Sequence, residues 1–209
     1  MHPLIKPNFI AVLLFFSQTA ISKDYIVEMI FFANTNSGAN SVHISNQAIE
    51  PDLGASISLS QGAQSNGFVP LSSDTFTLSG KANALNKSGK YRVLKHMSWL
   101  QPGLAKEDAI AVRIHAGKNY KSEFSERSFT NQPTNELDGT VKIVLGRYLH
   151  LYTDLAYRKT FSVSSSDALG RDRVLADFPV KTHRKMRSST LHYIDHPYLG
   201  ILIEIRPAG

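Results

Sequence analysis

The chain has 209 residues, of which 42% are hydrophobic, with 23 basic residues against 17 acidic ones and no cysteine. This length suits one full domain or two small ones. The lack of cysteine excludes disulfides, lipid attachment at a lipobox cysteine, and cysteine peptidases and transpeptidases, while the modest positive charge favours a partner that carries carboxylates or phosphates.

The first 22 residues have the composition of a secretory signal. Lys6 precedes an uninterrupted apolar run from Phe9 to Phe16, and small and polar residues follow as far as Ser22. The run is well short of the ~20 residues that span a bilayer, so we expect cleavage near Ser22 rather than an anchor. No other segment is apolar enough to span a membrane, and residues 23–209 are expected to form a single exported domain.

In the first half of this domain the sequence predicts strands that are separated by one long surface segment. Residues 25–33 are rich in β-branched and aromatic side chains and predict a central strand. Residues 34–73 are rich in Ser, Asn and Gly and predict a surface excursion, with a short strand at 55–59 and a segment that docks back at 68–71. Residues 74–88 predict a short helix.

The capping residues of that helix are predicted to be Asp74 or Ser79 at its start and Gly89 at its end. A strand over residues 91–100 and a turn at 101–103 should follow. The next strand is predicted over residues 110–115 and a polar loop over 118–135.

Within residues 136–158, Val141, Ile143 and Leu145 share one strand face, and so do Leu149, Leu151 and Leu155, which is the period of β-strands. We expect a hairpin with a two-residue turn at Gly146-Arg147, although one long strand with a glycine bulge would also fit. His150, Tyr152 and Asp154 would then share one face of the second strand.

The last part predicts a Ser-rich loop over residues 160–177 and a strand over 178–192, with a bulge at 188–189. A turn at 195–197 would lead into an antiparallel strand over 199–206. Because strands dominate without regular alternation with helices, the predicted fold class is α+β, a predominantly antiparallel β sheet with one or two short helices.

The sequence gives little support to three kinds of catalytic site: a zinc site, an activated nucleophile and a pair of carboxylates. His192 and His196 flank Asp195, and His150 and His183 could join them around zinc, although Pro197 argues against a helix there and a hydrogen-bonded turn is the simpler interpretation. No nucleophile motif is present, and nothing marks a pair of carboxylates for glycoside hydrolysis. We therefore predict no catalytic residue, metal or cofactor.

Binding fits the residues better. Arginine guanidinium groups pair with carboxylates or phosphates through two hydrogen bonds, and aromatic rings stack on sugars. Nucleic acid is not expected, because the protein is exported and carries no motif for it. The candidate ligand-binding residues are Trp99, Arg147, His150, Arg184, Arg187, His192, Tyr193, Asp195 and His196.

Three segments together resemble the CsiV-type peptidoglycan-binding family of Gram-negative proteobacteria. They are Tyr25–Phe32, then Leu137-Asp-Gly139 with Arg147-Tyr-Leu-His150, and finally Arg184–Ser188 with Leu191–Pro197 and Gly200; Tyr91–Leu94 and Trp99 with Gln101-Pro102 also fit. The resemblance does not cover residues 34–73 or 160–177, and the last motif is its most specific part.

The resemblance implies a non-catalytic protein of the periplasm that binds peptidoglycan. It would support cell-wall assembly alongside the lipoprotein activator of a bifunctional penicillin-binding synthase. Two alternatives stay open: a metal-dependent or carboxylate-dependent wall hydrolase, and a protein-interaction module that meets the wall by charge attraction alone.

Overall fold

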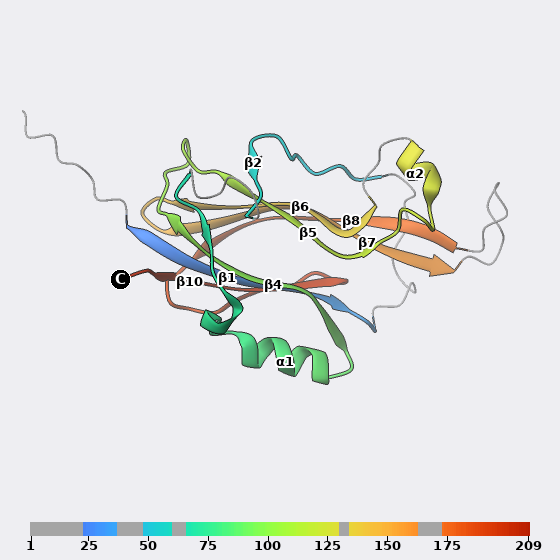
Figure 1. The fold of residues 1–209 in the computed structure, drawn as a ribbon, viewed down its shortest axis with the longest axis horizontal. Coiled ribbons are helices and arrows are strands. Elements are labelled where there is room, and N and C mark those ends of the chain that lie inside the picture. The colour runs from blue at the N-terminus through green and yellow to red at the C-terminus, as the bar shows by residue number, and fades with distance from the viewer. Residues whose placement is uncertain (1–22, 37–47, 60–65, 130–133, 163–172) are drawn as a thin grey trace, which may run out of the picture.

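Two five-stranded β sheets lie face to face in the computed structural model (Figure 1). The structure describes residues 23–36, 48–59, 66–129, 134–162 and 173–209, so the predicted signal segment lies outside the described residues. Antiparallel pairing dominates, and the two α-helices are short, which confirms the predicted fold class.

The first sheet has the strand order β3-β4-β1-β10-β9. Its strands are β1 (Asp24–Asn34), β3 (Val69–Pro70), β4 (Tyr91–Pro102), β9 (His192–Ile194) and β10 (Leu199–Pro207). The apolar strand β1 lies in the middle as predicted, because it pairs with β4 on one side and with β10 on the other.

The second sheet has the strand order β2-β5-β6-β7-β8. Its strands are β2 (Ser56–Ile57), β5 (Ala111–Asn119), β6 (Asn135–Leu145), β7 (Leu149–Ser162) and β8 (Arg173–Met186). Among the strands of the described residues, the two-residue contact of β2 with β5 is the one parallel pairing. Both short strands of the excursion, β2 and β3, therefore return to the body, as predicted for 55–59 and 68–71.

Strand β1 is buried on both faces. Val27, Met29 and Phe31 point into the core between the sheets, together with Leu151 and Leu155 of β7. The opposite face of β1 packs against helix α1 (Ser79–Lys87), where Ile30 and Phe32 meet Leu78 and Ala82. The outer face of the first sheet is thus covered by a helix.

The start of helix α1 corrects the predicted cap. The N-cap position is Leu78, which has no side-chain acceptor, and Asp74 lies in the preceding short 3-10 helix η2 (Ser73–Thr75). The backbone N–H groups of Thr77 and Leu78 instead donate to the buried carboxylate of Glu28, at 3.0 and 2.8 Å. A side chain from the middle of β1 therefore supplies the acceptor that the local sequence lacks.

Several predicted boundaries are wrong. Strand β4 continues through the predicted turn to Pro102, and β5 continues past Gly117, whose positive φ of 75° accompanies a break in the pairing. The predicted polar loop at 118–135 contains helix α2 (Ser125–Phe129), and Tyr120 and Phe124 are buried there with Leu175.

The β6–β7 hairpin is confirmed, but its loop has three residues rather than two, since Leu145 pairs directly with Leu149. The strand predicted over 178–192 also differs. Strand β8 begins at Arg173 and ends at Met186, after which the chain crosses to the other sheet through Ser189, which has a φ of 54°. Hence β8 and β10 are not partners; β10 pairs with β9 instead.

Candidate functional site

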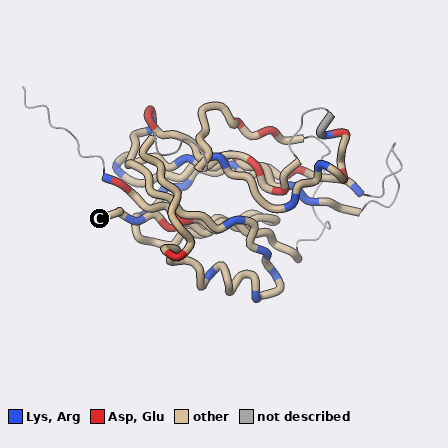
Figure 2. The backbone as a smooth tube through the Cα atoms, viewed as in Figure 1, with Lys and Arg blue, Asp and Glu red and all other residues tan. Residues whose placement is uncertain are grey.

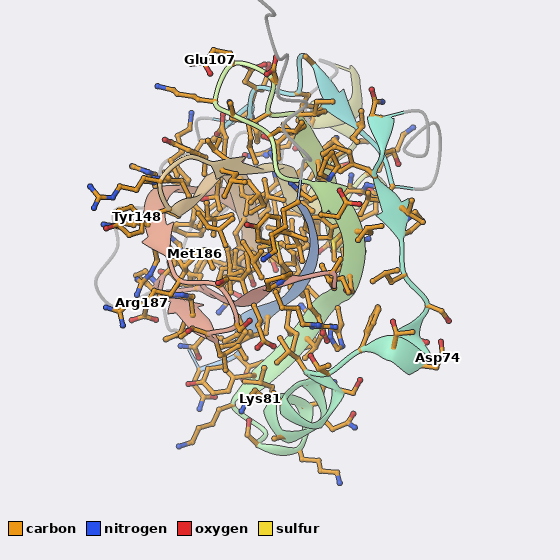
Figure 3. The ribbon with its side chains drawn as sticks, turned by 90° about the vertical axis from the view of Figure 1, so that its left-hand side faces the viewer. Asp74, Lys81, Glu107, Tyr148, Met186 and Arg187 are labelled. Atoms are coloured by element: carbon orange, nitrogen blue, oxygen red, sulfur yellow. The ribbon has the colours of Figure 1, made fainter. Side chains whose placement is uncertain are left out.

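The loop of the β6–β7 hairpin and the end of β8 bring two predicted residues together. Arg147 and Arg187 line one hollow of about 280 Å³, with Tyr148 and Met186 beside them. Figure 3 shows Tyr148, Met186 and Arg187 next to one another at this end of the sandwich. We call Arg147, Tyr148, Lys185 and Arg187 the hairpin-end patch.

Cations dominate this patch. The Lys185 ammonium lies 3.3 Å from the centre of the Tyr148 ring, and the Arg147 guanidinium lies 5.7 Å from it. Tyr148 is 41% exposed, so the ring holds both cations at the surface by cation–π contact. None of the described residues that line the hollow is acidic, so it is suited to an anionic ligand such as a carboxylate.

His150 lies next to the patch, on the outward face of β7 opposite Lys185. Its Nδ1 is 2.9 Å from Nε2 of His183 on β8, and the His183 ring stacks on Tyr152 at a centroid distance of 4.3 Å. The prediction that His150, Tyr152 and Asp154 share one face of the strand is confirmed, because Leu151 between them lies in the core and Lys185, His183 and Lys181 are their respective partners on β8.

The other motif residues gather elsewhere. Tyr193 on β9 is 45% exposed, stacks on Phe32, and donates its hydroxyl hydrogen bond to Asp195 at 2.6 Å. Burial and this contact raise the pKa of the Tyr193 hydroxyl. His196 accepts from the backbone N–H of Tyr198, and burial lowers the pKa of its imidazole.

These residues lie toward the opposite end of the first sheet from the hairpin-end patch. β9 pairs with β10 from Ile201 to Ile203, whereas Tyr25, which lines the patch hollow, pairs with Pro207 at the far end of β10. His192 is closer to the patch, since its ring bonds to the backbone of Arg187. The motif 183–197 therefore contributes to two surfaces instead of one.

Trp99 and Arg184 have contrasting positions. Trp99 is fully buried, and its indole N–H donates to Gln101 at 2.9 Å, so it belongs to the core and does not reach a ligand surface in this structure. Arg184 is exposed on β8, opposite Leu151, and does not line the hollow that contains Arg187.

The zinc alternative required four histidines to converge. His150 and His183 form one pair, while His192 contacts Arg187 and His196 contacts Tyr198. Within the described ranges, no group of three or more His, Asp or Glu side chains could hold a metal ion. The specific arrangement that would support a zinc hydrolase is thus not formed.

A second and larger hollow, which the sequence did not single out, lies over the outward face of β6, β7 and β8. Its volume is about 600 Å³, and we call it the outer groove. The described residues that line it with polar groups include Asp52, Thr140, Lys142, Tyr152, Asp154, Lys181 and His183. The sequence places Tyr152 and Asp154 on one strand face, but no signal in it joins them to the loop and the two neighbouring strands, whose register is set only by folding.

The described residues form a β-rich sandwich with one polar hollow over the second sheet and one basic hollow at the hairpin end. Over residues 7–208 the chain matches the model of the family described as "Peptidoglycan-binding protein, CsiV". The chain therefore belongs to this family, as the motifs had suggested. The family's description indicates peptidoglycan binding and so a place in the cell envelope. Searches among curated proteins and among solved structures gave no match.

Basic residues lie on both sheets and on helix α1 and are not confined to one region (Figure 2). Net charge alone therefore does not locate a wall-binding surface. No helix of the described residues is long and apolar enough to cross a membrane.

Proposed function

We propose that this protein is a non-catalytic accessory of the periplasm that binds peptidoglycan through the hairpin-end patch and supports cell-wall assembly. Membership of the family supports the ligand, and the signal-like first 22 residues support export. The observation that carries the choice of surface is that Arg147 and Arg187 line one hollow without an acidic neighbour among its described lining residues.

Peptidoglycan carries carboxylates on its peptide stems, and guanidinium groups bind carboxylates with two parallel hydrogen bonds. Both arginines are exposed, so binding a carboxylate does not require the core to move. Lys185 adds a third cation, held in place over Tyr148. Contacts of this kind should give binding that weakens with salt without vanishing, because paired guanidinium contacts add hydrogen bonds to the screened attraction.

The test is co-sedimentation of the mature protein with purified sacculi at low and high salt, with soluble products assayed in the same tube. The double variant Arg147→Ala/Arg187→Ala should pellet at least tenfold less than wild type. The matched control is Lys81→Ala/Lys87→Ala, which removes the same charge from two exposed positions of helix α1 (Lys81 in Figure 3). The control should pellet like the wild-type protein.

Other outcomes would refute parts of the proposal. Equal losses in both double variants would mean that net charge drives the attraction and that the patch is not a site. Failure of the wild-type protein to pellet would refute wall binding itself. Released muropeptides would restore the hydrolase alternative.

We also propose that the partner in wall assembly is the lipoprotein activator of a bifunctional penicillin-binding synthase. This partner is implied by the family resemblance, so the test is whether the two proteins bind each other directly. The mature protein should be retained by the immobilised activator in the absence of wall material. Retention only after sacculi are added would mean that the two proteins merely share a ligand, and the proposed contact would be rejected.

A further inference from the structure

The outer groove has the dimensions and position of a ligand site. Its volume of about 600 Å³ falls inside the range of ~300–1,000 Å³ that is usual for small-molecule pockets. Its floor is the outward face of β6, β7 and β8, and its wall is the chain segment 52–56, which crosses above the sheet (Figure 1). This groove is distinct from the hairpin-end patch, whose lining shares no residue with it.

Buried charges hold the wall in place. Arg158 is completely buried and bonds to Asp177 at 2.9 Å, and Arg127 bonds to the other oxygen of Asp177 at 2.7 Å. The Arg158 guanidinium also donates to the backbone carbonyl of Ile49 at 2.8 Å, and the backbone N–H of Ile49 donates to Asp177 at 2.9 Å. Ile49 lies three residues before the wall segment. Asp154 then accepts from the backbone N–H of Asp52 at 3.1 Å. The groove is therefore built before any ligand arrives.

The groove floor presents polar groups in two rows across the three strands. Lys142, Tyr152 and His183 are paired across the three strands and form one row. Thr140, Asp154 and Lys181 are paired in the same way and form the next row. Side chains directly opposite on adjacent strands are about 5 Å apart. A compact ligand with several polar groups would thus meet several of these side chains at once.

The rings in this floor do not offer a platform for a sugar. Tyr152 and His183 are parallel within 4°, so each covers one face of the other. His150 stacks on His183 as well, and the Lys142 ammonium lies 5.9 Å from the centre of the Tyr152 ring. What the rings present to a ligand is their polar edges, which favours hydrogen-bonding groups over the apolar face of a sugar.

The charges of the groove are balanced, in contrast to those of the hairpin-end patch. Lys142 and Lys181 stand against Asp52 and Asp154, and the Lys181 ammonium is 3.1 Å from the Asp154 carboxylate. A ligand with negative charge alone would face two carboxylates, and one with positive charge alone would face two ammonium groups. A ligand that carries both charges would meet a partner for each.

We propose that the outer groove binds a zwitterionic group, an ammonium and a carboxylate on one carbon, at the end of a wall peptide side chain. In this arrangement the Lys142 ammonium pairs with the ligand carboxylate. The ligand ammonium pairs with the carboxylates of Asp154 and Asp52, where it competes with the Lys181 ammonium for Asp154. The inference rests on peptidoglycan as the ligand and names the part of it that is recognised. It assigns to the groove only the side-chain end of the stem that carries both charges, and it leaves the other stem carboxylates to the hairpin-end patch.

The experiment is a calorimetric titration of the mature protein with two synthetic wall tripeptides. One ends in meso-diaminopimelate, whose side chain has both an ammonium and a carboxylate, and the other ends in lysine, which has the ammonium only. We expect the diaminopimelate peptide to bind at least tenfold more tightly. Amide NMR shifts on binding should concentrate at positions 142, 152, 154 and 181.

Two variants test the assignment. Lys142→Met keeps the aliphatic stem and removes the charge, and it should weaken the diaminopimelate peptide about tenfold while barely changing the lysine peptide. Lys181→Met is a second variant at an exposed position, which removes the competing ammonium and should strengthen both peptides. Lys81→Met on helix α1 is the control and should bind both peptides as the wild-type protein does.

Equal affinity for the two peptides, no binding of either, or an unchanged affinity in Lys142→Met would overturn the inference. If sacculi still pellet with the protein in those cases, the proposed function stands and the groove alone is rejected. If the peptide binds but sacculi do not pellet, the groove assignment stands and wall binding through the patch fails.

Discussion

The Glu28 carboxylate offers the sharpest test of how this fold is held together. It is fully buried beneath the start of helix α1 and accepts hydrogen bonds from the backbone N–H and hydroxyl of Thr77 and from the backbone N–H of Leu78. His96 lies 2.9 Å from one carboxylate oxygen, and Arg206 lies 3.4 Å from the other. One side chain therefore joins the helix to three strands.

The change Glu28→Ala should lower the free energy of unfolding by about 3–5 kcal/mol, the usual cost of removing one partner from a buried charged network. Loss of the helix cap accounts for about 1 kcal/mol of this, and unpaired groups at His96 and Arg206 for most of the rest. Glu28→Gln keeps the shape and one acceptor oxygen and should cost about 1–3 kcal/mol.

The pH dependence follows from the pKa of Glu28. Burial raises this pKa, but the hydrogen bonds from Leu78 and Thr77 outweigh burial, so the net pKa lies below the ordinary value of 4.5. A group whose folded pKa is lowered stabilises the fold above its unfolded pKa and loses that contribution as the pH falls through its folded pKa. The gap between wild type and Glu28→Ala should therefore be constant from pH 7 to 5 and narrow only below about 4.5.

Urea unfolding at pH 7, 5 and 4, followed by circular dichroism, measures these differences. A loss of less than about 1 kcal/mol in Glu28→Ala at pH 7 would refute the argument that this carboxylate caps the helix. A gap that widens as the pH falls below 4.5 would refute the assigned direction of the pKa shift.

Two further changes test packing and the groove wall. Gly200→Ala would place a Cβ 2.1 Å from the ring of Phe32, so we expect a loss of about 1–3 kcal/mol by urea unfolding, whereas Gly80→Ala on helix α1 has open space and should be neutral or stabilising. Asp177→Asn removes the counter-charge of the buried Arg158 and should cost about 3–5 kcal/mol. It should also speed amide hydrogen exchange at residues 48–57, and unchanged exchange there would show that the buried pair does not hold the groove wall.

The fold class could be predicted because period-two patterns reflect burial directly. The recurrence of Val141, Ile143 and Leu145 at every second position indicates one core-facing strand. The largely apolar stretch after Tyr25 indicates a strand that is covered on both faces. The predicted ends of two strands, β4 and β5, are wrong because each strand continues through a residue that usually ends a strand. Pro102 remains paired with Asp24, and Gly117 is accommodated by a break in the β5–β6 pairing.

Relations between distant elements were not visible in the sequence. The acceptor for helix α1 is 50 residues before Leu78, and no local pattern connects the two. The pattern of residues 183–197 predicts one hairpin, but a turn at Ser189 sends its two halves to different sheets. Arg147 and Arg187 are separate ligand-binding candidates in the sequence; that they line one hollow depends on the register of β7 with β8.

The outer faces of the two sheets differ in what covers them. The outer face of the first sheet is closed by helix α1 over Ile30 and Phe32. In the described part of the chain, the outer face of the second sheet carries polar side chains, and residues 52–56 lie over it. Holding this segment requires the burial of Arg158 and Asp177, and a buried ion pair by itself adds little net stability. Apolar residues could close this face at lower cost, so the charged anchor is best explained by the shape it maintains: an open polar groove with a fixed wall.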